Sequence, residues 1–348
     1  MTRKVRIGIT RDLFDKEGKF YTPGPGLKLL DDMPNVEWAM FPTFIPDITP
    51  DQIRDFDLVI TLKPKWTARS FASDSQIICV HRSGVGYDEV NVPDLTRAGV
   101  LLCNTPESVR RPLATGIICF ILALSLNLAR KDRLAREGRW ADRANNMGVG
   151  LIGKTLGSLG VGGIGHEMFR LAGPFGMKHL ACDPYVKPEA LADINVTLVD
   201  MDTILRESDF LSISVPLSEK TRHLIGENEL RKMKKTAYLI NTSRGPLVDE
   251  KALTRALQEG WIKGAAVDVF EQEPTPVDNP LLKLENAIVT PHAIGWTDEV
   301  WSGKWEENLT QVSQIMREEM PDSMVNKEVW QSPVFQARLK KFLKETRG

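Results

Sequence analysis

Short apolar runs alternate with helical patterns along almost the whole chain, and this alternation limits the possible folds more than any other feature. In the first part of the chain the runs are VRIGI (5–9), DLVIT (57–61), QIICV (76–80) and GVLLC (99–103). Aliphatic and β-branched runs of this length, separated by helical segments, are typical of parallel strands joined by crossover helices. The pattern therefore predicts an α/β fold built on doubly wound parallel sheets.

A second series of runs follows a long apolar segment and contains enough strands for a nucleotide-binding sheet. Its members are TLGSLG (155–160), KHLAC (178–182), DFLSIS (209–214), TAYLIN (236–241), GAAVDV (264–269) and NAIVT (286–290). Six strands in this order match one complete dinucleotide-binding sheet. Because 348 residues are about twice the usual length of one domain, we expect two lobes.

The segment between the two series, Pro112–Ala129, has no charged residue over a length close to that of a membrane-spanning helix. Arginines flank it on both sides and give no orientation bias, so a buried core helix with Pro112 in its first turn is favoured over a span. A further helix is expected over 298–318. The polar, basic tail 337–348 is expected to be a solvated terminus.

The composition argues against several classes of protein. A hydrophobic content of 42% and a net charge of −1 exclude a disordered chain and a nucleic-acid binder that relies on bulk positive charge. The N-terminal sequence MTRKVRIGIT has only a strand-length apolar run and predicts no signal peptide. Four cysteines stand singly in apolar runs without a CxxC pair, which predicts reduced, buried thiols, no metal site and a cytoplasmic protein: Cys79, Cys103, Cys119 and Cys182.

Residues 160–165, GVGGIG, fit the GxGxxG pattern, follow a predicted strand and precede a helical pattern. In that context Gly160 permits a tight turn, Gly162 lets a pyrophosphate approach the backbone, and Gly165 allows close packing of helix on strand. The glycines alone also fit a turn that binds no ligand. Asp183 ends the next strand, where a carboxylate accepts hydrogen bonds from the ribose hydroxyls and repels a 2′-phosphate, so the sequence predicts NAD as cofactor.

Three polar residues follow three successive strands of the second series: Arg244 in NTSRG, Glu273 in FEQEP and His292 in TPH. Loops after parallel strands emerge on one edge of the sheet, so these side chains should converge at the nicotinamide. A guanidinium can bind a carboxylate and its neighbouring carbonyl, an imidazolium can protonate the developing alkoxide, and a carboxylate stabilises a charged imidazole. Each residue alone also fits a structural role, but together they predict reduction of a 2-keto acid.

The sequence resembles the D-isomer-specific 2-hydroxyacid dehydrogenase family from about Val5 to Asn326. The matching motifs are RSGVGYDEVNV (82–92), NTPESV (104–109), the glycine segment through ACDPY (181–185), SVPLSEKTRHLI (214–225), LINTSRGPLVDEKAL (239–253), AAVDVFEQEP (265–274) and TPH (290–292). The resemblance implies a Rossmann NAD-binding domain, residues 104–295, inserted into a flavodoxin-like substrate-binding domain, residues 1–103 plus 296–348. It also implies a homodimer, whereas the near-neutral charge and the arginines that flank the apolar segment argue against a nucleic-acid or membrane partner.

The resemblance implies a role for each matching residue. Arg244 binds the substrate, Glu273 supports His292, and His292 is the acid/base. The implied substrate contacts are Gly84, Val85, Gly86, Arg244 and His292, and Trp296 is a further candidate because it lies near His292 in sequence. The implied cofactor contacts are Gly160, Gly162, Gly163, Ile164, Gly165, Asp183, Pro216, Thr221, Thr242, Asp268, His292 and Gly295.

The chain also departs from the family pattern. Thr115 falls where members commonly carry an acidic residue, which leaves the local contacts to nicotinamide or partner open. Trp301 and Trp305, four residues apart, should pack their helix, whereas Trp296 either walls the substrate pocket or packs between the lobes. Formate dehydrogenases have glutamine where Glu273 stands, so formate oxidation is disfavoured.

The predicted function is NAD(H)-dependent interconversion of a small 2-keto acid, such as glyoxylate or hydroxypyruvate, with its D-2-hydroxy acid. One alternative is a non-enzymatic NAD(H) sensor, like the corepressors on this fold. Another is a short phosphoglycerate dehydrogenase. The side chain of the substrate is not fixed by any spacing rule.

Overall fold

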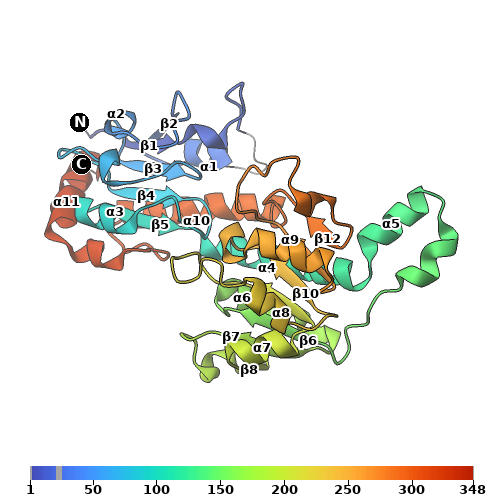
Figure 1. The fold of residues 1–348 in the computed structure, drawn as a ribbon. Helices are drawn as coiled ribbons and strands as arrows, with labels where there is room; N and C mark the ends of the chain where they lie inside the picture. Colours follow the sequence, from blue (N-terminus) through green and yellow to red (C-terminus); the bar gives the residue numbers. More distant parts are fainter. Residues whose placement is uncertain (1, 21–25, 348) are drawn as a thin grey trace. The chain divides into compact units, whose positions relative to one another are not determined.

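The computed structural model describes residues 2–20 and 26–347. The chain forms two compact units (Figure 1). The first unit contains Met1–Val109 and Thr297–Gly348, and the second contains Arg110–Trp296. The second unit is thus an insertion in the first, and the α/β architecture with two parallel sheets confirms the predicted fold class.

The first unit is built on a parallel sheet with strand order β2-β1-β3-β4-β5, the order of flavodoxin-like folds. Successive residues of a strand enter cores on opposite faces: Leu58 and Ile60 pack on one side of the sheet, and Val59 on the other. The strands are β1 (Val5–Ile9), β2 (Val36–Met40), β3 (Leu58–Thr61), β4 (Cys79–Arg82) and β5 (Leu101–Asn104). The helices are α1 (Gly26–Asp31), α2 (Pro50–Ile53), α3 (Val92–Ala98), α10 (Asp298–Met316) and α11 (Pro333–Arg347).

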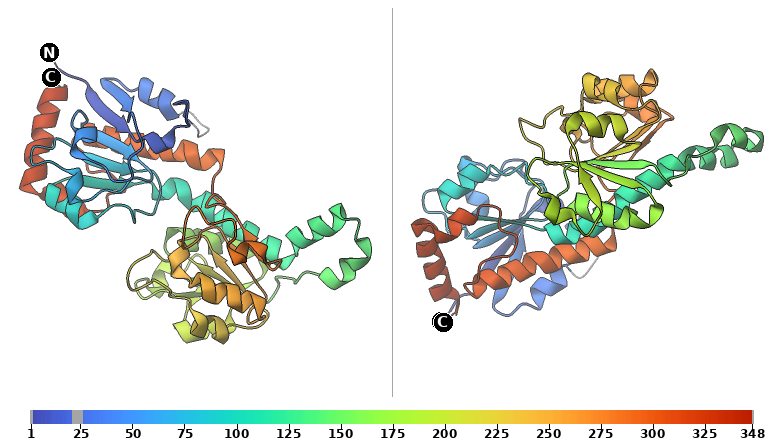
Figure 2. Two further views of the ribbon diagram at one scale, coloured as in Figure 1. Left: turned by 45° about the horizontal axis from the view of Figure 1, so that its top comes forward. Right: turned by 90° about the horizontal axis from the view of Figure 1, so that it is seen from below.

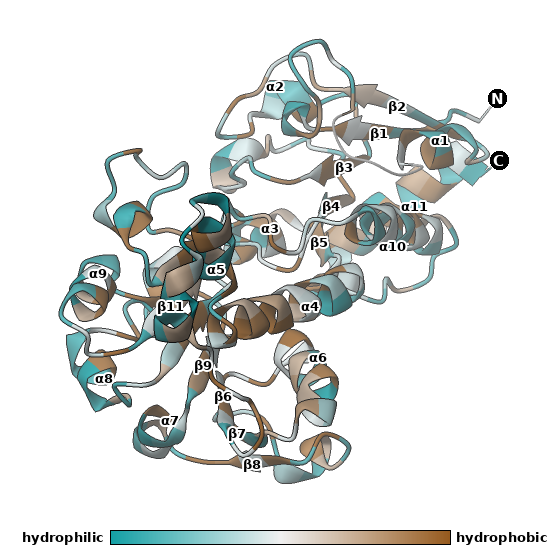
Figure 3. Ribbon diagram, turned by 90° about the vertical axis from the view of Figure 1, so that its right-hand side faces the viewer, coloured by the Kyte–Doolittle hydropathy of each residue, from teal (hydrophilic) through white to brown (hydrophobic). Residues whose placement is uncertain are grey.

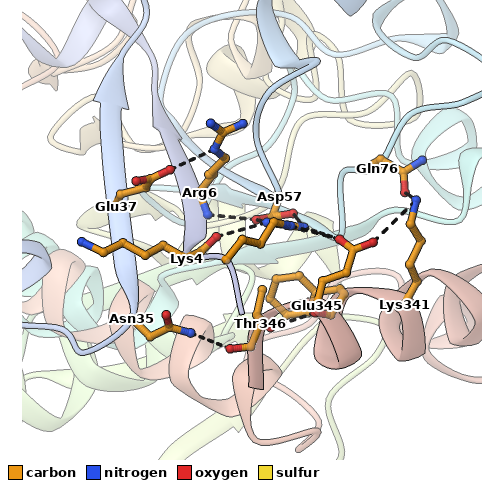
Figure 4. Close-up of polar contacts among 11 residues, drawn as sticks. Lys4, Arg6, Asn35, Glu37, Asp57, Gln76, Lys341, Glu345 and Thr346 are labelled. Atoms are coloured by element: carbon orange, nitrogen blue, oxygen red, sulfur yellow. Dashed lines mark hydrogen bonds and ion pairs between the residues drawn. The ribbon is translucent and has the colours of Figure 1, made fainter. Parts of the chain in front are cut away.

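The C-terminal segment is a packed helix, so the prediction of a solvated tail is wrong. Within α11, Phe335, Leu339 and Phe342 are buried in the same core as β1 and β3. Figure 4 shows the polar contacts that hold this helix beside the first strands, including the bond from the Asn35 side chain to the Thr346 carbonyl, 2.6 Å long. The tail looks polar in sequence because its charged residues cover the outer face of an amphipathic helix.

The second unit, teal to orange in Figure 2, is built on a parallel sheet with order β12-β11-β10-β9-β6-β7-β8, and the direction of winding reverses between β6 and β9. Ligands of open α/β sheets bind at such a reversal, beyond the carboxyl ends of the strands. The strands are β6 (Thr155–Leu159), β7 (Lys178–Cys182), β8 (Val196–Leu198), β9 (Phe210–Ile213), β10 (Tyr238–Asn241), β11 (Gly264–Val267) and β12 (Ala287–Val289). The helices include α5 (Leu128–Arg136), α6 (Gly163–Ala172), α7 (Met201–Glu207), α8 (Glu227–Lys232) and α9 (Glu250–Gln258).

Short 3-10 helices connect several of these elements, and none of them was predicted. They are η1 (Arg11–Leu13), η2 (Ala68–Ser70), η3 (Trp140–Asn146), η4 (Gly173–Phe175), η5 (Pro188–Leu191), η6 (Gly245–Leu247), η7 (Pro280–Lys283) and η8 (Lys327–Gln331). Two strands were also missed, β2 and β8. Both lie at the edge of their sheets, where half-exposed residues dilute the apolar signal.

The long apolar helix α4 spans Pro106–Ser125, so the prediction that Pro112 lies in the first turn is wrong. The helix begins at Pro106, and Pro112 lies inside it. Among the described residues, α4 is the one helix long and apolar enough to cross a membrane, a test that buried core helices also pass. Its side chains Ile117, Phe120 and Ile121 are buried in the core of the second unit, and Figure 3 shows its apolar stretch beside that sheet.

Two further predictions can be compared with the structure. Trp301 and Trp305 are both 3% exposed and pack α10 into the core of the first unit, as expected. The prediction that all four thiols are buried is wrong, because Cys119 is exposed on α4 and Cys182 is half-buried. The apolar run around Cys119 suggested burial. A helix that packs against a sheet on one side can still expose residues on its other side.

Candidate functional site

The glycine segment after β6 has the backbone geometry that a pyrophosphate requires. Gly160 has a φ of +83°, and a Cβ there would lie 2.5 Å from the Ser214 carbonyl oxygen. Gly162 precedes α6, and a Cβ on it would meet nothing within 4 Å, so its backbone faces open space. A Cβ on Gly165 would lie 2.9 Å from the Gly160 carbonyl oxygen, which is the close approach of helix to strand. The free N–H groups at the start of α6 can therefore meet a phosphate.

Two charged side chains lie beside this segment. The Asp183 carboxylate accepts hydrogen bonds from the backbone N–H groups of Val161, at 3.0 Å, and Tyr185, at 2.9 Å. The guanidinium of Arg110 approaches Gly163, whose Cβ would lie 3.0 Å from Nε. An arginine at the start of α6 adds positive charge where phosphates bind, and the sequence reasoning missed it because Arg110 precedes the motif by some fifty positions.

The acid and the histidine predicted for catalysis are hydrogen-bonded to each other. His292 Nδ1 lies 2.7 Å from Glu273 Oε2, and the two side chains are 46% and 36% exposed. The other carboxylate oxygen of Glu273 accepts a hydrogen bond from Phe270 N–H at 2.9 Å. Since Nδ1–H donates to the carboxylate, Nε2 is the nitrogen left to exchange a proton with a ligand.

The positive charge of Arg244 acts on the same pair of side chains. Burial acts to raise the pKa of Glu273, but the bonds from His292 and Phe270 together with the positive charges of His292 and Arg244 lower it overall. The structure thus brings together side chains from the loops after β10, β11 and β12, at one edge of the second sheet. A guanidinium, an imidazole and a carboxylate in this arrangement can bind an anion and transfer a proton beside it.

Asp268, at the end of β11, holds the segment that carries the histidine. Its Oδ1 accepts hydrogen bonds from Thr290 Oγ1 at 2.6 Å, Ala293 N–H at 2.9 Å and Ile294 N–H at 3.1 Å. Its carbonyl oxygen accepts from His292 N–H at 2.7 Å. Burial raises the pKa of this carboxyl, although those bonds act to lower it. These contacts support His292 in a left-handed conformation, with a φ of +53°.

The loop that carries Arg244 is fixed by its neighbours. Asn241 Nδ2 donates to the Arg244 carbonyl oxygen at 2.9 Å, and Ser243 Oγ donates to the Ile213 carbonyl oxygen at 2.8 Å. Gly245 packs against the backbone of Phe270, where a Cβ could not fit. The backbone at Arg244 is therefore set before any ligand arrives.

The other predicted cofactor residues lie in loops of the same unit. Thr221 Oγ1 donates to the Pro216 carbonyl oxygen at 2.8 Å, which closes the loop after β9. Thr242 is buried at the end of β10. A Cβ on Gly295 would lie 3.4 Å from the Leu113 side chain of α4, so Leu113 is the neighbour that this position faces. Ile164 and Gly163 begin α6.

Two residues that depart from the family pattern have identifiable surroundings. The Thr115 hydroxyl donates to the Arg111 carbonyl oxygen at 2.9 Å, so it bonds to its own helix. Trp296 is 46% exposed at the end of the second unit.

The predicted substrate loop belongs to the first unit and follows β4. Gly84 has a φ of +145°, and a Cβ on it would overlap the guanidinium of Arg82. The carbonyl oxygens of Gly84 and Val85 accept hydrogen bonds from Thr105 N–H, at 3.1 Å, and Asn104 Nδ2, at 2.9 Å. These bonds orient the loop's carbonyls toward β5.

Comparison with known proteins identifies relatives across most of the chain. Residues 118–293 match the family model described as "D-isomer specific 2-hydroxyacid dehydrogenase, NAD binding domain". A glyoxylate reductase from Korarchaeum cryptofilum is 40% identical over 80% of this chain and 85% of its own length. A D-3-phosphoglycerate dehydrogenase from Methanocaldococcus jannaschii is 36% identical over 86% of this chain but only 57% of its own length. The crystal structure of an Aquifex aeolicus D-lactate dehydrogenase complexed with NAD and lactic acid superposes with a TM-score of 0.80 and 26% identity, over 92% of this chain and 99% of that one.

Proposed function

Because the chain belongs to the D-isomer-specific 2-hydroxyacid dehydrogenase family, we propose that it reduces a small 2-keto acid such as glyoxylate or hydroxypyruvate to its D-2-hydroxy acid with NADH. The observation that carries the proposal is the 2.7 Å bond between Glu273 and His292, with the charge of Arg244 acting on the same carboxylate. These groups stand at the sheet edge where a dinucleotide binds. The relative named glyoxylate reductase supports a small keto acid as substrate.

In the proposed reaction each of the three side chains has one task. NADH supplies the hydride when it is bound. Arg244 binds the carboxylate of the keto acid through its planar donor fork and so orients the carbonyl carbon. His292 Nε2 donates its proton to the carbonyl oxygen as negative charge develops there. Glu273 accepts the Nδ1–H bond, fixes the ring orientation and stabilises the imidazolium that the reaction consumes.

The cofactor assignment rests on a binding unit for NAD(P) and on one carboxylate. We propose that the dinucleotide phosphates bind at Gly160, Gly162, Gly163, Ile164 and Gly165, and that Asp183 selects NAD(H) over NADP(H) by repelling a 2′-phosphate. Further proposed cofactor contacts are Pro216, Thr221, Thr242, Asp268, His292 and Gly295. Substrate contacts are proposed at Gly84, Val85, Gly86, Arg244, His292 and Trp296.

We also propose a cytoplasmic homodimer in which residues 104–295 form the cofactor domain and residues 1–103 with 296–348 form the substrate domain. Support for dimerisation comes from an arm formed by α5 and η3, which extends away from the second sheet in Figure 2. Five large apolar side chains at or near this arm are exposed: Leu126, Leu128, Trp140, Met147 and Ile152. Apolar surface of this kind is characteristic of protein–protein contacts.

One experiment separates this function from its alternatives. NADH oxidation is measured with glyoxylate, hydroxypyruvate, pyruvate, phosphohydroxypyruvate and longer branched keto acids. Steady turnover of a small keto acid is the expected result. A protein that binds NADH but turns over no keto acid would instead be a dinucleotide sensor. Turnover confined to phosphohydroxypyruvate would identify a short phosphoglycerate dehydrogenase, the activity of the relative from M. jannaschii.

A further inference from the structure

Three side chains that can bind a metal ion meet in the core of the first unit, on one face of its sheet. Cys79 and His81 are two positions apart on β4, so both point to the same face. Cys103 of β5 is paired with His81 in the strand register, which brings its side chain to that face as well. All three residues are completely buried. No metal site was predicted from the sequence, because these ligands come from two strands and form no CxxC pair.

The sulfur and nitrogen atoms of this cluster are close enough to bind a single ion. The Cys79 thiol donates a hydrogen bond to Cys103 Sγ over 3.5 Å. One donor atom from each of the three side chains lies within 4.8 Å of the other two. Zinc–sulfur bonds of about 2.3 Å at tetrahedral angles place two sulfurs roughly 3.8 Å apart, which is close to the observed separation. Only small side-chain movements are therefore needed to close the site on an ion.

The hydrogen bonds around His81 leave one of its ring nitrogens available. Gln311 of α10 donates from Nε2 to the Asn104 carbonyl oxygen at 2.8 Å, so its Oε1 is the atom turned toward His81. His81 Nδ1 lies 3.1 Å from that oxygen and therefore carries the proton. Nε2 is then an acceptor, and within the described residues it is buried without a hydrogen-bond partner. Metal-bound histidines have this arrangement, in which the second ring nitrogen donates to a protein oxygen.

The unpartnered nitrogen distinguishes this cluster from ordinary core residues. Buried polar atoms are nearly always hydrogen-bonded, because an acceptor without a donor costs free energy. Burial lowers the pKa of His81 to about 4, so the ring is neutral and Nε2 keeps its lone pair. The thiols of Cys79 and Cys103 are weak hydrogen-bond groups but strong ligands for soft metal ions. A lone pair beside two thiols therefore indicates a metal ion as the missing partner.

We propose that Cys79, His81 and Cys103 bind a metal ion that prefers sulfur ligands, and that this ion is Zn²⁺. On binding, both thiols release their protons to solvent, and the two thiolates balance the two positive charges beside the neutral imidazole. Cu⁺ also prefers thiolates, but it leaves a net negative charge in the core. Zinc sites with three protein ligands and a further ligand in the fourth position are well known.

The proposed site ties β4 to β5 and has a structural role. None of its three residues is among the proposed cofactor or substrate contacts, so the proposal does not depend on the dehydrogenase function. Because the ion binds the folded chain, Zn²⁺ should raise the melting temperature of the metal-free protein. The turnover of any keto acid is a separate measurement.

The test measures the bound metal directly in the full-length protein. Protein purified without an affinity tag is analysed for zinc and copper by plasma mass spectrometry and should contain zinc in a one-to-one ratio to the chain. Metal-free protein, prepared by unfolding and by refolding with a chelator, is then titrated with Zn²⁺ in competition with a chromophoric chelator. It is also titrated with Co²⁺, which should produce the near-ultraviolet charge-transfer absorption of a thiolate–cobalt bond.

Alanine variants of the two cysteines identify the ligands. Cys79→Ala and Cys103→Ala should each weaken Zn²⁺ binding roughly 100-fold or more and remove the rise in melting temperature, because a thiolate ligand is lost. Gln311→Met leaves the three ligands in place but removes the oxygen that orients His81, and it should weaken binding by roughly 10- to 100-fold. Cys119→Ala is the matched control, because this exposed cysteine lies on α4 of the second unit, and it should change neither quantity.

Three results would overturn the proposal in whole or in part. Wild-type protein that contains no zinc when purified and gives no thiolate absorption with Co²⁺ would refute the site, whatever the stability of the variants. Zinc binding that persists in Cys79→Ala and Cys103→Ala but is lost in Cys119→Ala would refute it as well, since the ion would then bind at the exposed thiol. Bound copper that depends on Cys79 and Cys103 would overturn the assignment of Zn²⁺ and retain the ligand set.

Discussion

Replacing Glu273 with glutamine tests the link between the acid and the histidine directly. Glutamine keeps an oxygen that can accept the hydrogen bond from Phe270 N–H, 2.9 Å long in the wild-type protein, so the loop should retain its shape. The substitution removes the negative charge beside His292 and replaces the oxygen that accepts its Nδ1–H bond with an NH2 group. Because reduction of the ketone needs a protonated imidazole, rates fall at high pH when that proton is lost. Without the carboxylate, this alkaline limb should move to lower pH.

The size of this effect at high pH follows from the geometry of the His292–Glu273 pair. Two unit charges about 4 Å apart attract by about 1 kcal/mol in water and about 4 kcal/mol in a medium of dielectric constant near 20. The side chains of His292 and Glu273 are 46% and 36% exposed, so solvent screens the pair and the lower end applies. Loss of about 1 to 2 kcal/mol of this attraction corresponds to a roughly 5- to 30-fold lower rate at the alkaline end of the profile.

The assay is the initial rate of NADH oxidation with saturating glyoxylate between pH 5.5 and 9.5. Glu271→Gln serves as the matched control, because Glu271 lies two positions away in the same loop and pairs with a different histidine, His223, at 2.9 Å. That control should leave the limb in place. A limb in Glu273→Gln that coincides with wild type would refute the assignment of Glu273 to the proton on His292.

Three further predictions concern other parts of the chain. Replacing His292 with alanine should lower turnover roughly 100-fold or more and leave the NADH affinity, measured by fluorescence titration, nearly unchanged; near-normal turnover would rule out its role as the acid. Burial lowers the pKa of His81 to about 4. Because the unfolded chain takes up this proton below about pH 6.5 and the folded chain only near pH 4, about 3 kcal/mol of stability should be lost between these pH values in urea unfolding experiments on the metal-free protein. His81→Asn should show a smaller loss. If the arm of the second unit forms the dimer contact, Trp140→Glu combined with Met147→Glu should give a monomer in light scattering, and a dimer of unchanged mass would show that the contact lies elsewhere.

Most of the central strands could be predicted, because strands buried on both faces appear as continuous apolar runs. The run at 238–241 is an example, with every residue of β10 buried. Edge strands lack that signal. In β2 only Val36 is buried, and β8 has only three residues, none of them buried. The C-terminal helix was missed for a related reason: α11 buries Phe335, Leu339 and Phe342 on successive turns, while lysines and arginines between them make the segment look polar.

Some residues of the molecule can likewise be recognised from a sequence motif, whereas the surroundings of others depend on tertiary packing alone. The sheet topology of the second unit could be predicted, and three of its strands are followed by Arg244, Glu273 and His292. The sequence therefore predicted that these side chains converge. The position of Lys304 could not be predicted in this way, because a lysine in the segment SGKWEEN has the composition of a solvent-exposed helix face. Its burial arises from the turn-by-turn contact of α10 with β4, a tertiary property that no local pattern encodes. The buried ammonium lies 4.2 Å from the centre of the Trp301 ring, a contact between residues three positions apart that forms only when α10 is folded and packed.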